Sequence, residues 1–225
     1  MVRRTFTDEG DYRRAWDAAG EPAQVSRIYE IAEYVSTALG PKGFSLFHNG
    51  GLPMLRRRRG DIWDEIVFPH QPLAYDFAVR FHLNHDGVGQ VRARFWRPST
   101  RAPKAIAAGD VGMLESPPVW SIWATSEHAR TGEAILNVLR EDYLPWSDLF
   151  DDPPRLREAL LGGHVPLVDL STGVELMLAE FDVREARRFF RSVSEPEWPP
   201  VFTARPAGFE LHEDRLATIA AYYQL

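Results

Sequence analysis

The sequence lacks cysteine altogether and is poor in lysine, and both shortages exclude whole classes of chemistry. Without cysteine, the 225-residue chain has no disulfide, no thiolate metal site and no cysteine nucleophile. Only two of its 26 basic residues are lysine, Lys42 and Lys104. Lys42 lies in a glycine- and proline-bounded turn (residues 40–43) rather than in a phosphate-binding loop. Schiff-base and phosphate-loop enzymes are therefore not expected.

The chain also lacks a long apolar run, and its first residues do not predict a secretory leader. No segment reaches the roughly 18 consecutive apolar residues that a membrane helix needs. Residues 1–9 carry charge but no apolar core segment. Together with the absence of disulfides, these features predict a cytoplasmic protein without a membrane partner. The excess of arginine over lysine is typical of a GC-rich bacterial genome.

Hydrophobic residues make up 44% of the chain and aromatic residues 12%, which is enough to build a core. The net charge of −6 opposes a polyanion partner, because the long-range field of the protein repels phosphate. We expect a polar N-terminal arm over residues 1–20 and a single α+β domain over residues 21–194. A proline-rich loop and a C-terminal helix packed on the domain follow over residues 195–225.

The first half of the chain changes from a helical period to a period of two. Apolar residues three and four apart predict a helix over residues 25–39. Alternation then predicts an antiparallel meander of about five strands, with a loop over residues 98–118. The expected strands lie at residues 44–47, in a hairpin around residues 56–68, and at residues 75–83, 91–96 and 119–124.

The second half is mostly helical. Helices are predicted over residues 126–142 and 153–161, over residues 183–193, where Asp182 and Glu185 form a capping box, and near residues 216–223. Residues 165–181 read as a hairpin, although residues 174–179 could also begin a helix. The expected fold class is α+β, an antiparallel sheet packed by helices with an additional helical C-terminal part.

Four consecutive arginines, residues 56–59, stand directly before a Gly60-Asp61 turn. Counting outward from this turn pairs Arg56 with Glu65, Arg57 with Asp64, Arg58 with Trp63 and Arg59 with Ile62. Opposed charges stabilise a hairpin by roughly 0.2–1 kcal/mol per pair, and Arg58 over Trp63 adds a cation–π contact. The favoured interpretation is a solvated hairpin that neutralises itself. The alternative is a basic tip that binds a partner.

The sheet is expected to present a polar face with arginine and tryptophan. Arg80, His82 and Asn84 share one face of a strand, and Arg92, Arg94 and Trp96 share a face of the next. Arginine and tryptophan are enriched at protein-interface hot spots. Aromatic residues between arginines are also used by single-stranded nucleic-acid platforms, although no aromatic-glycine signature is present here. A solvent-facing or helix-covered sheet surface is the third interpretation.

Motifs for metal binding and catalysis are absent. His82 and His85 are three residues apart, so on a strand they point to opposite faces. There is no helical histidine pair, calcium loop, serine elbow or glycine-rich dinucleotide fingerprint. No metal, cofactor or catalytic residue is predicted, and an enzymatic activity is not favoured.

The order of features resembles an uncharacterised bacterial family, the domain of unknown function numbered 4304. The resemblance rests on Gly43-Phe44, the arginine-rich hairpin from Arg56 to Trp63, the alternating segment 75–83 and a Leu-Pro-Trp segment at residues 144–146. It covers about residues 25–190. Phe68-Pro69-His70 stands where such proteins often carry glutamine. The resemblance implies a fold and no catalytic residues.

These observations favour a non-enzymatic protein-binding module, of the inhibitor or immunity type, that acts through an Arg/Trp-bearing sheet face. Its predicted binding residues are Arg58, Trp63, Arg80, His82, Asn84, Arg92, Arg94 and Trp96. A nucleic-acid-associated protein that uses the same face is the first alternative. A hydrolase with a dispersed site is the second.

Overall fold

The computed structural model describes most of the chain outside its N-terminal segment and several connecting segments. The described residues are 23–49, 52–69, 76–77, 79–94, 104–111, 120–121, 128–165, 167, 169–193 and 215–225. They fall into two compact units. Unit 1 comprises residues 1–58, 64–81 and 110–144, and unit 2 comprises residues 59–63, 82–109 and 145–225. The domain boundaries expected from the sequence stay a prediction.

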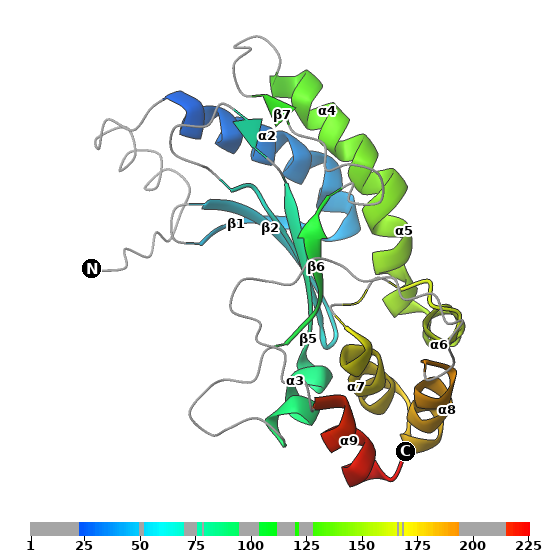
Figure 1. The fold of residues 1–225 in the computed structure, drawn as a ribbon. Coiled ribbons are helices and arrows are strands. Elements are labelled where there is room, and N and C mark those ends of the chain that lie inside the picture. Colours follow the sequence, from blue (N-terminus) through cyan, green and yellow to red (C-terminus); the bar gives the residue numbers. More distant parts are fainter. Residues whose placement is uncertain are drawn as a thin grey trace, which may run out of the picture. The chain divides into compact units, whose positions relative to one another are not determined.

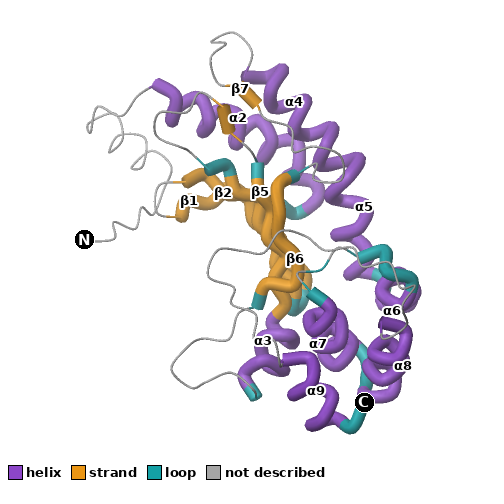
Figure 2. Tube along the Cα trace, in the orientation of Figure 1, coloured by secondary structure: helices purple, strands orange, loops and turns teal. Residues whose placement is uncertain are grey.

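The fold is α+β, with a five-stranded antiparallel sheet and helices, as the sequence predicts (Figures 1 and 2). The strand order is β1-β2-β3-β5-β6, which is the order of a meander. The five strands are β1 Ser45–Asn49, β2 Leu52–Arg59, β3 Ile62–Val67, β5 Arg80–His85 and β6 Ala105–Asp110. A separate two-stranded ladder joins β4 Asp76–Phe77 to β7 Trp120–Ser121.

In unit 1, α2 Ala23–Leu39 confirms the first predicted helix. Its apolar stripe is buried, with Ile28, Ile31, Ala32, Val35 and Leu39 at 1% exposure or less. A 3₁₀ turn, η1 Gly40–Lys42, follows, and Gly43 takes the left-handed conformation (φ 86°) that leads into β1. Proline and glycine therefore end the helix where the sequence places the stop.

The helix α4 His128–Val138 packs beside α2 (Figure 1). Close approach requires Gly132, because a Cβ there would stand 2.5 Å from Cδ1 of Tyr34. The Tyr34 hydroxyl donates to Glu133 (3.0 Å), and this hydrogen bond raises the pKa of the phenol. The helical run continues through the π-helical turn η2 Leu139–Tyr143, α5 Leu144–Ser147 and the 3₁₀ turn η3 Asp148–Asp151. It is therefore longer than predicted.

The segment 75–83 is divided rather than continuous. β4 pairs with β7, whereas β5 joins the main sheet. In β5 the alternation is confirmed: Phe81, Leu83 and His85 are buried, and the residues between them are not. The loop predicted over residues 98–118 is wrong in part, because β6 lies within it. Its Ala-Ile-Ala-Ala-Gly-Asp sequence has low β propensity and no alternation, so its burial reflects tertiary packing.

In unit 2, the strand predicted at residues 91–96 is wrong where the structure describes it. Asp86–Ala93 form a helix, α3. Its buried residues Val88, Val91 and Arg92 are three and four positions apart, which is a helical stripe. Because Arg92 is charged, the sequence pattern does not identify it as part of a buried helical stripe. The buried His85 caps the helix, because its Nδ1 accepts a hydrogen bond from the Val88 amide (3.2 Å).

The hairpin predicted at residues 165–181 is also wrong, and the helical alternative is nearer the structure. Leu170–Glu180 form α7, capped by Asp169, which accepts from the Thr172 amide (2.8 Å). The helix is buried from Ser171 through Met177, so it has no polar face to reveal a helical period. It packs against α3, α6 Pro153–Leu161, α8 Val183–Val193 and α9 Arg215–Tyr223.

The remaining helices of unit 2 confirm their predictions. Asp152 caps α6 and accepts from the Arg155 amide (3.3 Å). Asp182 accepts from the Glu185 amide (2.9 Å) at the start of α8, as the capping box requires. The buried face of α8 includes Ala186 and Phe189.

Candidate functional site

The arginine hairpin pairs as the sequence predicts, but one of its pairs is buried. Arg56 donates to Glu65 (2.7 and 3.0 Å), and Arg57 donates to Asp64 (2.9 and 3.3 Å). The side chains of Arg57 and Asp64 are 5% and 0% exposed, so this pair is a core element rather than part of a solvated hairpin. Tyr143 donates a third hydrogen bond to Asp64 (2.8 Å). The surrounding hydrogen bonds offset the cost of burying the two charges.

The hairpin tip lies in unit 2 and is anchored there. Arg59 contacts Asp151 (2.6 Å), and its second nitrogen donates to the carbonyl and hydroxyl of Ser147 (3.0 Å each). Trp63 donates its indole N–H to Asp86 (3.3 Å), and Lys104 lies 5.6 Å from the centre of the indole ring. Lys104 also pairs with Asp86. The stacking of Arg58 on Trp63 stays a prediction.

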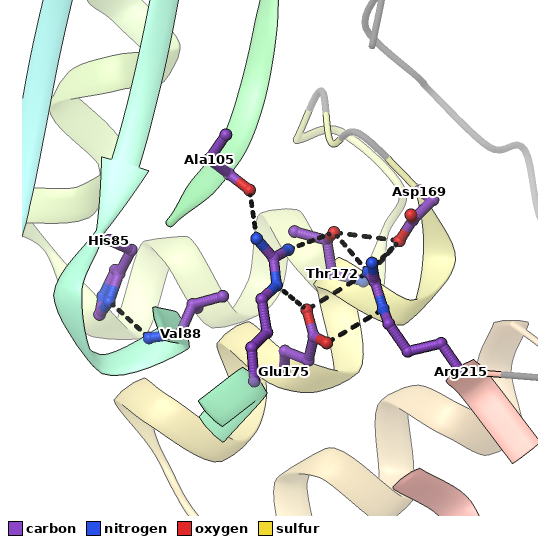
Figure 3. A network of polar contacts seen from close by, with 8 residues as sticks. His85, Val88, Ala105, Asp169, Thr172, Glu175 and Arg215 are labelled. Carbon is purple, nitrogen blue, oxygen red and sulfur yellow. Dashed lines mark hydrogen bonds and ion pairs between the residues drawn. The ribbon is translucent and has the colours of Figure 1, made fainter. Parts of the chain in front are cut away.

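Arg92, predicted to lie on an open sheet face, is fully buried in a charged network of unit 2 (Figure 3). It donates to Glu175 (2.7 Å), to the Ala105 carbonyl (2.7 Å) and to Thr172 (2.9 Å). Arg215 of α9 approaches Glu175 from the other side (3.1 Å). Arg92 therefore holds α3, β6 and α7 together, and the prediction that it lies on an open sheet face is wrong.

Asp169 completes this network. It accepts from Arg215 (2.8 Å) and from the Thr172 hydroxyl (3.0 Å). Two guanidinium groups thus face two carboxyl groups in the interior. Burial raises the pKa of the Glu175 carboxyl, and the two guanidinium groups oppose that shift. Burial likewise lowers the pKa of Arg92 against the effect of Glu175. This network of ion pairs and hydrogen bonds joins α3, β6, α7 and α9 and therefore has a structural role.

The other predicted residues are dispersed. Arg94 is exposed after the end of α3 and donates to the Tyr223 hydroxyl. Trp96 lies outside the described residues. His82 and Asn84 are half-buried on the side of β5 away from Leu83, as the alternation predicts. His85 points to the other side, where its Nε2 contacts Glu180 (2.5 Å). In the part of the chain that the structure describes, no three His, Asp or Glu side chains are grouped to hold a metal.

One surface of unit 1 does gather arginine with an aromatic residue. Ser45 of β1 lies directly opposite Arg56 of β2, so Phe47 and Arg56 point to the same side of the sheet. The Arg56 guanidinium lies 5.3 Å from the centre of the Phe47 ring. Arg58 shares this side by alternation and is exposed. Glu65 shares it through its hydrogen bonds to Arg56.

Arg80 belongs to the same side. Tyr143 contacts both Asp64, by its hydroxyl, and Phe81, by ring centroids 5.2 Å apart. Asp64 and Phe81 therefore point to the helix-covered side of the sheet, and their chain neighbours point away from it. We call the group Phe47, Arg56, Arg58, Glu65 and Arg80 the outer sheet face. Arg80 is 52% exposed and pairs with Asp110 (3.2 Å).

The sequence interpretation found four of these five residues, Arg58 and Arg80 as binding candidates and Arg56 and Glu65 as a hairpin pair, and missed the contribution of Phe47. It also missed an arginine stripe on α8. That stripe consists of Arg184, Arg187, Arg188 and Arg191, at positions i, i+3, i+4 and i+7. The helical spacing of these arginines is visible in the sequence. The sequence interpretation considered only the capping box and the apolar face of this helix, which includes Phe189.

Comparison with known proteins gives no relative on which to base a function. No protein-family model matches the chain, and no curated protein or solved structure matches it significantly. The resemblance to the domain of unknown function numbered 4304 thus stays a prediction. Among the described helices, none has the length and apolar character needed to cross a bilayer.

Proposed function

We propose that the chain is a non-enzymatic protein-binding module and that the outer sheet face contacts its partner. The observation that carries this proposal is Phe47, which is 43% exposed beside arginines on the same face. Large exposed apolar side chains are costly in water and gain free energy when a partner covers them. Aromatic residues and arginine are the residue types most enriched at the centre of protein interfaces.

The geometry favours a rigid contact surface. Arg56 is fixed on two sides, by its hydrogen bonds to Glu65 and by the Phe47 ring. A side chain that is already ordered loses less conformational entropy on binding. Arg58 and Arg80 extend the surface with positive charge, which favours a partner whose contact surface is acidic.

A cytoplasmic bacterial inhibitor or immunity protein is the biological role that we propose for this module. Such a protein needs a stable scaffold and one preorganised face. The antiparallel sheet is the scaffold in this proposal, and the ordered side chains of the outer sheet face are the preorganised surface. The proposal implies that the partner is encoded near this chain. Co-expression of the chain with the product of the neighbouring gene tests this: relief of that product's toxicity supports the role, and no effect on a toxic neighbour contradicts it.

The contact face is tested with a Phe47→Ala/Arg58→Glu double variant. A protein captured from a lysate of the source organism is purified, and its Kd for the wild type and the variant is measured by calorimetry. Loss of an aromatic–arginine hot spot is expected to weaken binding about 30-fold or more, equivalent to about 2 kcal/mol. Both side chains are at least partly exposed, so the unfolding midpoint is expected to stay close to that of the wild type.

The matched control is Arg155→Glu, which reverses a charge on α6 at a side chain that is 70% exposed. It is expected to leave the Kd unchanged. Equal affinity of the partner for the wild type and the double variant would remove the outer sheet face from the interface. Capture of nucleic acid instead of protein by the wild type would contradict the function itself.

A further inference from the structure

The exposed side of α8 carries a concentration of positive charge that the outer sheet face does not explain. The arginine stripe and Ser192 line a hollow of about 440 Å³. The helical positions i, i+3, i+4 and i+7 place the four guanidinium groups along one line. Over seven residues, this line is about 10 Å long. The chain as a whole has a net charge of −6, so the stripe is a local inversion of sign.

Among the residues that the structure describes, one carboxylate lies within ion-pair distance of this stripe. Glu185 approaches Arg184 at 3.6 Å and Arg188 at 3.9 Å, and it also lies 4.0 Å from Arg157 of α6. These distances exceed the 2.7–2.9 Å of a charge-assisted hydrogen bond. Glu185 is 10% exposed, so it lies beneath the stripe rather than over it. Most of the hydrogen-bonding capacity of the stripe therefore faces outward.

Arg187 is fixed in place by the end of the chain. Its Nε and Nη2 donate to the Gln224 carbonyl at 3.2 and 2.9 Å. This contact brings the residues at the end of α9 beside α8. Tyr222, two residues before Gln224, is 62% exposed. Val183, directly before Arg184 at the start of the stripe, is 37% exposed. Two of the four large apolar side chains that are exposed among the described residues thus lie on the helix that carries the stripe and on the helix that contacts it.

We propose that this surface, the arginine stripe of α8 together with Val183 and the exposed Tyr222 of α9, is a second docking site and that it binds an acidic segment of a protein. Carboxylates of the partner pair with the guanidinium groups, and its apolar side chains cover Tyr222 and Val183. Like charges at i+3 and i+4 destabilise a helix by about 0.2–0.5 kcal/mol per pair. Occupation by carboxylates removes this repulsion.

The flanking apolar residues favour a protein over a nucleic acid. Affinity for a phosphate backbone comes from the number of phosphates neutralised, and strong binders make roughly 6–10 such contacts. The four arginines of the stripe, with one carboxylate nearby, provide fewer phosphate contacts than this. The net negative charge of the chain also repels a nucleic acid. A protein segment gains from both the charge of the stripe and the exposed apolar area beside it.

The test uses a fluorescein-labelled, glutamate-rich peptide containing leucines, and fluorescence anisotropy at low and at physiological salt. The wild type is expected to bind the peptide with a Kd that rises with salt. Arg188→Glu is expected to weaken binding about three- to tenfold, because it replaces one attraction with a repulsion. A single-stranded oligonucleotide of equal charge is expected to bind more weakly than the peptide at each salt concentration.

Arg155→Glu is a close control for Arg188→Glu. Arg155 is 70% exposed and Arg188 is 65% exposed, and each has a carboxylate three residues earlier, at 4.0 and 3.9 Å. The two variants change the net charge equally. The proposal is overturned if the peptide does not bind at low salt, if both variants weaken it equally, or if the oligonucleotide binds more tightly. The Phe47→Ala/Arg58→Glu variant is expected to bind the peptide normally, which separates this site from the outer sheet face.

Discussion

At the scale of single residues, some arginines are buried in the structure although the sequence places them on the surface. Arg57 and Arg92 both come from polar-looking segments, and both are buried with a carboxylate partner. The hairpin count found the partner of Arg57, because a tight turn fixes which residues face each other. The partner of Arg92 lies on α7, 83 residues away, and local pattern carries no information about it.

The buried network of unit 2 predicts a large effect from a small change. Glu175→Gln keeps the shape of the side chain but removes the carboxylate that Arg92 and Arg215 share. Loss of one partner from a buried ion network costs about 3–5 kcal/mol, because buried charge is left uncompensated. Urea unfolding should show this loss in the free energy of unfolding.

Two further variants test the reason for that loss. Glu158→Gln, at an exposed position of α6, is expected to change the unfolding free energy by no more than about 0.5 kcal/mol. Arg92→Met combined with Glu175→Leu removes both members of one pair and is expected to cost less than Glu175→Gln alone. A double variant that is less stable than Glu175→Gln would mean that hydrogen bonding, not uncompensated charge, dominates.

At the scale of elements, the sequence predicted those helices whose caps and apolar stripes are both visible. α2 ends at a proline and glycine stop, and α6 and α8 begin at aspartate caps. α3 and α7 were misread for opposite reasons. In α3 a charged residue occupies a core position, whereas α7 is buried almost throughout and has no polar side. β6 is built from small residues, so only packing in the sheet identifies it.

The contact between α7 and α8 depends on a residue without a side chain. A Cβ at Gly173 would lie 2.3 Å from Cζ of Phe189 and 2.5 Å from Cε1 of the same ring. Because Phe189 is fully buried, the ring has little room to move. Gly173→Ala is therefore expected to destabilise the protein by about 1–3 kcal/mol through overpacking, despite the better helix propensity of alanine.

A second substitution in the same contact checks that explanation. Phe189→Leu shortens the side chain, so Gly173→Ala is expected to cost less in a Phe189→Leu background than in the wild type. The double-mutant cycle, measured by thermal or urea unfolding, should give a coupling free energy of about 0.5–3 kcal/mol. Strictly additive effects would show that the two side chains do not clash.

At the scale of the whole molecule, the sequence identified the fold class and the order of the first four strands of the main sheet, because alternation and turn residues specify them locally. It did not reveal which surfaces remain open, since exposure depends on elements that are distant in the chain. Arg80 and Arg58 remain on the outer sheet face, whereas Arg92 became part of the interior. The structure has two surfaces that combine arginine with exposed apolar residues: the outer sheet face in unit 1 and the arginine stripe in unit 2.

The net charge of −6 and the burial of Arg92 lead to a prediction about the nucleic-acid alternative. We expect no binding of single-stranded oligonucleotides at about 150 mM salt, because the net negative charge of the chain repels a polyanion. Fluorescence anisotropy measures this directly.

Variants at Arg92 cannot decide the question, since they remove one of the two buried guanidinium partners of Glu175 and disturb folding. Arg58→Glu/Arg80→Glu is the informative variant, because both side chains are exposed. If the wild type binds the oligonucleotide, and its affinity falls less steeply with salt in this variant, the outer sheet face binds nucleic acid. That result would contradict the protein-binding proposal.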